Sequence, residues 1–327
     1  MAFGNRASMS RRHFVTMSAS GAALALGAAA CGEGATAEVP GDLEKPNITV
    51  GALPVVDFAA LWVAQQKGLF KRHGLNVKIQ VLSGGAAAAA KLASGELDFS
   101  INNYVSAIQA TESGKLPLKI VQDAYQLNPD AAGVLVPKDS AIHKPQDLKG
   151  KKIAVNTLAN VGQLLVTAGL QTYGIDAHDV HFKAIDFPKM VPAVQSHSVD
   201  AAWTVEPFVT QIEEKLGGRL ILDSAKGSTA DFPIGVYTAS AAFARRNPKT
   251  YAAFRDAIAH ATRMVAADRS LVEKTLPTYS KIDKKTASLI HLSTYPVSVN
   301  QQRAQQVADL MTQYGFLGKH FDIKPML

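Results

Sequence analysis

The sequence predicts an α/β protein of two lobes, each with a mainly parallel sheet, around a central cleft. Short apolar strands alternate with helical segments from about residue 48 to residue 222. The alternation falls into two blocks, and no Gly/Ser-rich linker separates them. The length of 327 residues suits about two domains. Together these observations favour two lobes that pack against each other.

The N-terminal segment predicts an export signal. Arg11 and Arg12 form a twin-arginine pair, and an alanine-rich apolar stretch at 21–30 leads to Cys31. The segment resembles a bacterial Tat-type lipoprotein signal, which implies that Cys31 is lipidated and anchors the protein to the outer face of the cell membrane. The alternative is an alanine-rich helix with an incidental cysteine. Residues 32–46 are rich in Gly, Ala, Glu and Pro and predict a flexible tether.

The first block begins with an apolar strand that is followed by a helix. Phe58, Leu61 and Trp62 have helical spacing after Asp57, and Gly68 ends that helix. Later boundaries are marked by glycines and by asparagines that can cap helices. The predicted elements are strands at 48–53, 77–82, 97–101, 118–121 and 133–136, and helices at about 58–67, 86–92 and 102–113.

The second block repeats this rhythm, and the chain then becomes mostly helical after Tyr237. Asn247-Pro248 is typical of a helix start, and Gly315 ends a helix that begins near Val299. The predicted elements of the second block are strands at 153–155, 180–185, 201–205 and 220–222, and helices at about 160–173 and 189–197.

Candidate ligand contacts lie just after the predicted strands, because ligands of open α/β sheets bind beyond the carboxyl ends of strands. Several of these residues also have purely structural interpretations. The glycines could form a turn, Trp62 could belong to the core, and the Asn and Thr side chains could only cap helices. The candidates are Asp57, Phe58, Trp62, Ser83, Gly84, Gly85, Asn102, Asn103, Tyr104, Asn156, Thr157, Asn160, Trp203, Glu206 and Asp231.

The charges of the candidate segments indicate the kind of solute. Asp57, Glu206 and Asp231 are acidic, whereas no Lys or Arg lies in the segments that follow the strands. A bare anion beside Asp57 would meet like-charge repulsion. We therefore expect a solute with a cationic, amine or other hydrogen-bond-donating group, with Trp62 or Trp203 as an apolar wall. The alternative is that Asp57 only caps its helix.

Four motifs carry a family resemblance. They are AQQKGLFKRHGLNV at 64–77, LASGELDF at 92–99, DLKGKKIAV at 147–155, and VDAAW with EP within 199–207. In this order they resemble ABC-importer solute-binding proteins of the class that handles nitrate, sulfonates, taurine and thiamine-pyrimidine precursors. The resemblance implies the periplasmic-binding-protein-like (type II) fold with two chain crossings. Lobe one would contain 47–135 plus 236–327, and lobe two would contain 136–235.

This resemblance implies a binding protein rather than an enzyme. It would capture a small organic solute, sulfonate/taurine-like or pyrimidine-like, and deliver it to an ABC permease driven by an ATPase subunit. The expected state is an exported monomer, held at the membrane through its lipid anchor. No cofactor is expected.

Composition and motifs exclude several other classes. The net charge of +7 comes from scattered basic residues, which disfavours a nucleic-acid surface. Cys31 is the sole cysteine, so the chain has no intrachain disulfide and no cysteine-based metal site. The sequence contains no Walker A, Gly-x-Ser-x-Gly or His-Glu-x-x-His motif. His178 and His181 read as loop residues rather than metal ligands.

Two other functions stay open from the sequence. One is a biosynthetic enzyme on the same fold, of the menaquinone-pathway or thiamine-pyrimidine type. The other is a surface signalling lipoprotein whose cleft serves no transporter. The export signal argues against the enzyme, because both enzyme classes resembled are cytoplasmic, and a neighbouring permease gene would argue against the signalling protein.

Overall fold

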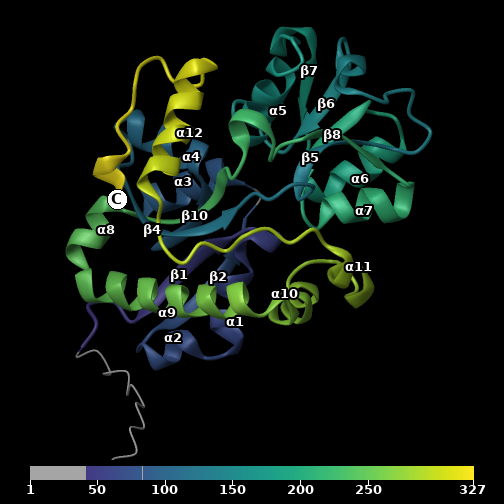
Figure 1. The fold of residues 1–327 in the computed structure, drawn as a ribbon. Coiled ribbons are helices and arrows are strands. Elements are labelled where there is room, and N and C mark those ends of the chain that lie inside the picture. The colour runs from purple at the N-terminus through teal and green to yellow at the C-terminus, as the bar shows by residue number, and fades with distance from the viewer. Residues whose placement is uncertain (1–41, 83) are drawn as a thin grey trace, which may run out of the picture. The chain divides into compact units, whose positions relative to one another are not determined.

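Two five-stranded sheets organise the computed structural model, which describes residues 42–82 and 84–327 (Figure 1). The predicted signal, with Arg11, Arg12 and Cys31, and most of the predicted tether lie outside the described residues. The first sheet has the order β2 (Asn76–Val81), β1 (Asn47–Ala52), β3 (Phe99–Asn103), β10 (Pro233–Ser240), β4 (Leu118–Gln126). The second has the order β7 (His181–Ala184), β6 (Lys152–Val155), β8 (Ala201–Val205), β5 (Ala132–Val136), β9 (Arg219–Asp223).

Both sheets are mixed, but in each of them four strands run in one direction and one strand is reversed, which agrees with the mainly parallel sheets that the sequence predicted. In the first, β1 pairs in parallel with β2 and β3, and β10 runs antiparallel between β3 and β4. In the second, β6 pairs in parallel with β7 and β8, and β5 runs antiparallel between β8 and β9. β5 and β10 are the strands that enter each sheet from the other lobe, and that entry reverses their direction.

The strand pairing also moves the predicted lobe boundaries. The whole of β5 belongs to the second sheet, so the chain first crosses between Gln126 and Ala132 rather than at 135. The whole of β10 belongs to the first sheet, so the return crossing lies between Asp223 and Pro233 rather than at 235. β5 and β8 are buried along their entire lengths, as expected for strands in the middle of a covered sheet.

Helices cover both faces of the first sheet (Figure 1). α9 packs on α1 and α2 on one side, and α4 packs between α3 and α12 on the other. Phe254 of α9 stacks on Phe99 of β3 with 3.9 Å between ring centroids, which joins that helix to the sheet. The helices are α1 (Ala59–Gln66), α2 (Leu69–Arg72), α3 (Gly85–Ser94), α4 (Tyr104–Glu112), α8 (Ala241–Arg246), α9 (Pro248–Ala267), α10 (Arg269–Thr275) and α12 (Gln301–Gln313).

The second sheet carries fewer helices. α6 and α7 pack together beside β8, and α5 packs against β8 and β9. α11 belongs to the C-terminal part of the chain but contacts α7, so this part reaches lobe two instead of staying in lobe one as predicted (Figure 1). These helices are α5 (Val161–Gln171), α6 (Phe187–Gln195), α7 (Phe208–Leu216) and α11 (Lys284–Leu289).

Short 3-10 turns complete the chain, and the first of them shapes the candidate site. They are η1 (Val56–Phe58), η2 (Pro145–Leu148), η3 (Ala177–Asp179), η4 (Gly227–Thr229), η5 (Leu276–Thr278) and η6 (Lys324–Met326). Within residues 42–82 and 84–327, no helix is long and apolar enough to cross a bilayer.

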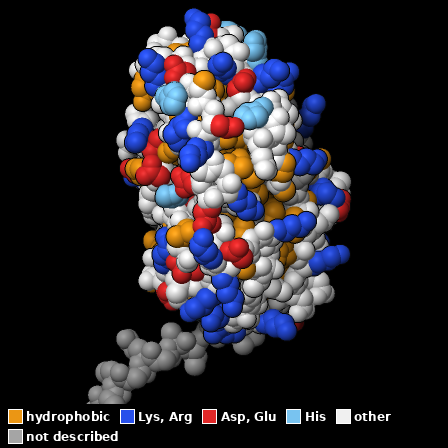
Figure 2. All heavy atoms as spheres, turned by 90° about the vertical axis from the view of Figure 1, so that its right-hand side faces the viewer, with side chains coloured by type: hydrophobic (Ala, Val, Ile, Leu, Met, Phe, Trp, Pro, Cys, Tyr) orange, Lys and Arg blue, Asp and Glu red, His pale blue; other side chains and the backbone are white. Residues whose placement is uncertain are grey.

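The surface charge is dispersed on the face that Figure 2 shows. Lysine and arginine side chains lie there among acidic and hydrophobic ones, and they form no continuous basic stripe. A surface that binds nucleic acid needs positive charge that is clustered in a patch or stripe.

Gly162 allows α5 to approach the indole ring of Trp203. A Cβ atom at this position would lie 2.3 Å from Trp203 Cε3, whereas a Cβ at Gly318 would meet no atom within 4 Å. We expect Gly162→Ala to lower the free energy of unfolding by about 1–3 kcal/mol, because the rigid ring must shift. Gly318→Ala is the matched control and should change it little. Urea unfolding of both variants measures the difference, and equal stabilities would show that the ring moves freely.

Candidate functional site

The strand ends of both lobes surround a cavity of about 40 Å³. The carboxyl ends of β1, β3, β6 and β8 point to it, and the start of β10 reaches the same edge because that strand is antiparallel. Lobe one contributes Leu53, Val55, Asp57, Phe58, Asn102, Asn103, Ile234 and Gly235, and lobe two contributes Asn156, Val161, Phe187, Trp203 and Val205.

Asp57 is the charged residue of the cavity wall. Its side chain is 5% exposed, and its Oδ1 has no hydrogen-bond partner. The alternative interpretation, in which Asp57 only caps its helix, does not hold, because neither η1 nor α1 has a side-chain cap hydrogen bond. The pKa of Asp57 is raised to about 7, mainly by burial. A hydrogen bond from its own backbone N–H lowers the pKa, and the nearby charge of Glu206 raises it.

The turn that carries Asp57 is held by the C-terminal part of the chain. The hydroxyl of Tyr279 donates to the Val55 carbonyl at 3.2 Å, and that of Tyr295 donates to the Val56 carbonyl at 2.8 Å. Burial raises the pKa of both tyrosines well above the ordinary value, and the charge of Asp57 contributes to this rise, so they stay neutral donors. The backbone of the turn that carries Asp57 is therefore held in place by the C-terminal part of the chain.

Asn102 presents a second unpartnered oxygen. Its Nδ2 donates to Thr238 Oγ1 at 2.7 Å, and the Thr238 hydroxyl in turn donates to the Ser100 carbonyl at 3.2 Å. The threonine proton is thus committed, so Thr238 Oγ1 acts as an acceptor and the amide nitrogen of Asn102 must face it. Asn102 Oδ1 is left buried without a partner, in a side chain only 1% exposed.

Asn156 supplies a third such oxygen, from lobe two. It follows β6 directly, and its Oδ1 is buried without a hydrogen-bond partner. Buried polar atoms without a partner are uncommon in folded proteins, because each costs about 1–3 kcal/mol. Three such acceptor oxygens around one cavity indicate a binding site for a molecule that donates hydrogen bonds.

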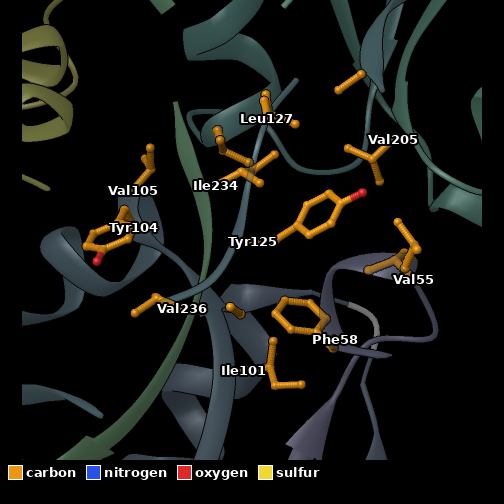
Figure 3. Packing of buried hydrophobic residues seen from close by; sticks show 14 of the residues in the cluster. Val55, Phe58, Ile101, Tyr104, Val105, Tyr125, Leu127, Val205, Ile234 and Val236 are labelled. Carbon is orange, nitrogen blue, oxygen red and sulfur yellow. The ribbon is translucent and has the colours of Figure 1, made fainter. Parts of the chain in front are cut away.

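Aromatic side chains form the apolar wall. Phe187 lies near Trp203, with 6.2 Å between ring centroids, and Phe58 reaches the cavity from lobe one. The indole N–H of Trp203 donates to Ser224 Oγ at 2.9 Å, which fixes the ring while leaving its face apolar. Figure 3 shows the same region, with Val55, Phe58 and Tyr125 of lobe one near Val205 of lobe two.

Asn103 and Asn160 join the lobes. Asn103 caps α4 by accepting from the Ser106 amide at 2.9 Å, and Asn160 caps α5 by accepting from the Val161 amide at 2.8 Å. Asn103 Nδ2 also donates to Asn160 Oδ1 at 2.9 Å, and Asn160 Nδ2 donates to Ser106 Oγ at 2.8 Å. Both asparagines thus act as caps, as one interpretation of the sequence had it, and the same caps connect the two sheets.

Glu206 forms hydrogen bonds within the protein and does not line the cavity. One carboxylate oxygen accepts from the Thr210 hydroxyl and from the His291 amide, both at 2.7 Å, and the other accepts from the Thr210 amide at 3.2 Å. Burial raises its pKa to about 7 in spite of these bonds. Glu206 therefore ties the start of α7 to the C-terminal part of the chain, which is not the ligand contact expected from the sequence.

Three other candidates also lie away from the cavity. Trp62 stacks on Tyr279 with 4.6 Å between ring centroids, which matches its core interpretation. The hydroxyl of Tyr104 donates to Asp123 inside lobe one. Asp231 is exposed and forms an ion pair with Arg303 at 3.2 Å.

The glycine-rich segment is described only in part. Ser83 lies outside the described residues. Gly84 immediately precedes α3, which begins at Gly85, and a Cβ atom on Gly84 would lie 3.5 Å from Thr157 Oγ1 of lobe two. Gly84 and Thr157 thus face each other across the lobes, although neither lines the cavity.

Sequence reasoning missed several apolar lining residues, which are Leu53, Val55, Val161, Phe187, Val205, Ile234 and Gly235. Phe187 follows β7, so the rule that selects segments after strands would have found it had it been applied to that strand. Ile234 and Gly235 lie at the start of β10, and only the antiparallel direction of that strand brings them to the site. No equivalent sequence signal marks that direction.

Charge and ligand chemistry limit what the cavity can hold. Among the described residues that line it, none is Lys, Arg or His. Across residues 42–82 and 84–327, no group of three or more His, Cys, Asp or Glu side chains could hold a metal ion. The arrangement suits a small neutral or cationic molecule.

We expect Asp57→Asn to stabilise the protein at pH 8. A raised carboxyl pKa means that the folded state binds the proton more tightly than the unfolded state, so this residue costs stability as the pH rises from about 4 to above 7. A rise from 3.8 to about 7 corresponds to at most about 4 kcal/mol. The gain in unfolding free energy should be largest at pH 8 and vanish near pH 4.

Urea titrations of wild type and Asp57→Asn at both pH values test this. Asp231→Asn, at an exposed aspartate that pairs with Arg303, is the control and should change the free energy of unfolding by less than about 1 kcal/mol. A gain of the same size at pH 4 and pH 8 would contradict the buried, ionisable state of Asp57.

Comparisons with known proteins agree with this geometry. The chain is 28% identical over 194 residues to the taurine-binding periplasmic protein of Escherichia coli (strain K12), which covers 59% of this chain and a little over half, 58%, of that protein. It is 26% identical over 297 residues to a putative thiamine biosynthesis protein of Haemophilus influenzae (strain ATCC 51907 / DSM 11121 / KW20 / Rd), covering 86% of this chain and 90% of the relative.

A solved structure shows the same fold. The alkanesulfonate-binding protein SsuA from Xanthomonas axonopodis pv. citri, bound to MOPS, superposes with a TM-score of 0.74 at 20% identity, over 87% of this chain and 99% of that one. The family described as "NMT1/THI5 like" matches residues 55–269, well over half of the chain. The protein is therefore a member of the NMT1/THI5-like family, with the α/β fold of periplasmic binding proteins.

Proposed function

We propose that this protein is the exported solute-binding component of an ABC importer, which captures one small organic solute between its lobes and delivers it to a membrane permease. The observation that carries the proposal is the cavity between the lobes, where three buried acceptor oxygens have no partner in the protein. A ligand that filled the cavity would supply the missing hydrogen bonds. The names of the relatives support a solute of the taurine or sulfonate kind, or one that belongs to thiamine biosynthesis.

Binding would require the lobes to open and close. The cavity of about 40 Å³ is far smaller than the roughly 300–1,000 Å³ of most ligand pockets. A solute of several heavy atoms therefore needs the lobes to separate first, and contacts to both lobes then favour the closed form. Only that form would dock productively on the permease. The Asn103–Asn160 hydrogen bond, which joins the lobes, would break and re-form in each cycle.

The biosynthetic relative favours a second function, an enzyme on the same fold. The predicted export signal favours the importer component over an enzyme, because the two enzyme classes that this chain resembles act in the cytoplasm. Anchoring at the outer face of the cell membrane, through lipidated Cys31, completes the proposal. Its partners would be the permease and its ATPase subunit.

Native mass spectrometry of the purified protein tests the binding function. We expect a small organic molecule to copurify at one per chain, and partial unfolding should release it. Where none survives purification, thermal-shift screening of small solutes should find compounds that raise the melting temperature. A protein with no bound solute and no stabilising compound would refute a solute-binding role.

Anchoring is tested with the full-length chain in a bacterial host. We expect the wild type to partition into the detergent phase, because several acyl chains at an N-terminus hold a protein stably at a membrane. Cys31→Ser should move the protein to the aqueous phase. Cys31→Ser that still partitions with the detergent would show that no lipid on this cysteine provides the anchor.

A further inference from the structure

We propose that the solute carries a nitrogen group with several N–H donors, such as a primary ammonium or an amidine-like group, and that this group binds the oxygens of Asp57, Asn102 and Asn156. The proposal rests on the solute-binding function and specifies the chemistry of its ligand. Two of the three side chains, Asp57 and Asn102, are more than nine-tenths buried. Each of the three presents a buried oxygen that accepts no hydrogen bond.

The orientation of Asn102 makes this set selective for donors. An asparagine amide could in principle turn its nitrogen to the ligand, but the Nδ2 of Asn102 is held by Thr238 Oγ1 at 2.7 Å. That threonine cannot donate in return, because its proton goes to the Ser100 carbonyl. The side chain therefore offers an acceptor only, as Asp57 does when ionised. A ligand oxygen without a proton would face lone pairs on both.

The rest of the cavity favours a cation over an anion. None of the described lining residues is basic, so an anion would meet Asp57 with no compensating side-chain charge. Asn103 and Asn160 cap the starts of α4 and α5, whereas α1 and α6, which begin beside the lining residues Phe58 and Phe187, have no side-chain cap. The charge of Asp57, with no basic residue beside it, therefore decides against an anion. The aromatic side chains of Phe58, Phe187 and Trp203 line the cavity and provide apolar surroundings that suit an ammonium or a planar heterocycle.

The same group would couple binding to closure. Asp57 and Asn102 belong to lobe one and Asn156 belongs to lobe two, so one donor group would be held by both sheets. In the open form it could satisfy only the lobe-one oxygens. The differential affinity that closure requires would then come from the hydrogen bond to Asn156.

Calorimetry with matched pairs of solutes tests the proposal. The pairs are taurine with ethanesulfonate, ethanolamine with ethylene glycol, and 4-aminopyrimidine with pyrimidine, together with any copurified solute. In the pair that binds, we expect the N–H-bearing member to bind at least about 10-fold more tightly. A copurified solute should contain an amine or amidine.

Two variants locate the contact. Asp57→Asn should weaken binding of the amine by about 10- to 100-fold, and Asn156→Ala should weaken it by about 5- to 10-fold. Asp231→Asn, away from the cavity, is the matched control and should leave affinity unchanged. Because Asp57→Asn is expected to be at least as stable as the wild type at pH 8, a loss of binding there is not a loss of folding.

The outcomes separate this inference from the proposed function. Ethanesulfonate that binds as tightly as taurine, a copurified solute without N–H groups, or tighter binding by Asp57→Asn would overturn the donor assignment while leaving the binding function intact. A protein that binds no solute at all would overturn both.

Discussion

A carboxylate that leaves water must regain its lost solvation from another group, and Asp57 regains only part of it within the protein. One of its oxygens has no partner, and burial raises its pKa to about 7. The surrounding structure holds the residue in this costly state through hydrogen bonds from Tyr279 and Tyr295 to the preceding backbone. A buried carboxylate oxygen without a partner, on a turn held by two tyrosines, supports the proposed hydrogen bond from a donor on the solute.

The topology of the sheets explains why this carboxylate meets residues from distant parts of the sequence. Parallel strands bring their carboxyl ends to one edge, which places Asp57 beside Asn102 in lobe one and sets Asn156 at the matching edge of lobe two. The antiparallel strands β5 and β10 each follow a crossing of the chain from the other lobe. Each sheet is thus completed by a strand that also links it to its neighbour, and the link lies next to the cavity.

The sequence was sufficient for most of the strands and helices and for most of the polar site residues, because hydrophobic periodicity and the strand-end rule depend on local spacing. It missed the strand β10 and the helix α7. It was insufficient where the outcome depended on partners far along the chain. Glu206 follows a strand as Asp57 does, yet the His291 amide and the start of α7 take up its carboxylate. Trp62 was separated from the site by a stacking partner, Tyr279, that lies more than 200 residues away. No short pattern encodes either pairing.

Glu206 also shows how the C-terminal part of the chain joins the two lobes. Its carboxylate holds His291, and its carbonyl accepts from the Val56 amide at 3.4 Å, in the turn that carries Asp57. Nearby, the antiparallel bridge between Gln126 and Thr294 ties the end of β4 to the same C-terminal segment. Because the segment with His291 and Thr294 contacts both lobes, it can keep the lobes attached to each other when the hydrogen bonds beside the cavity break. The two buried carboxylates therefore differ. That of Glu206 is satisfied by hydrogen bonds within the protein and helps to hold the lobes together. That of Asp57 has an oxygen without a partner, which in the proposed function would accept a hydrogen bond from the solute as the lobes close.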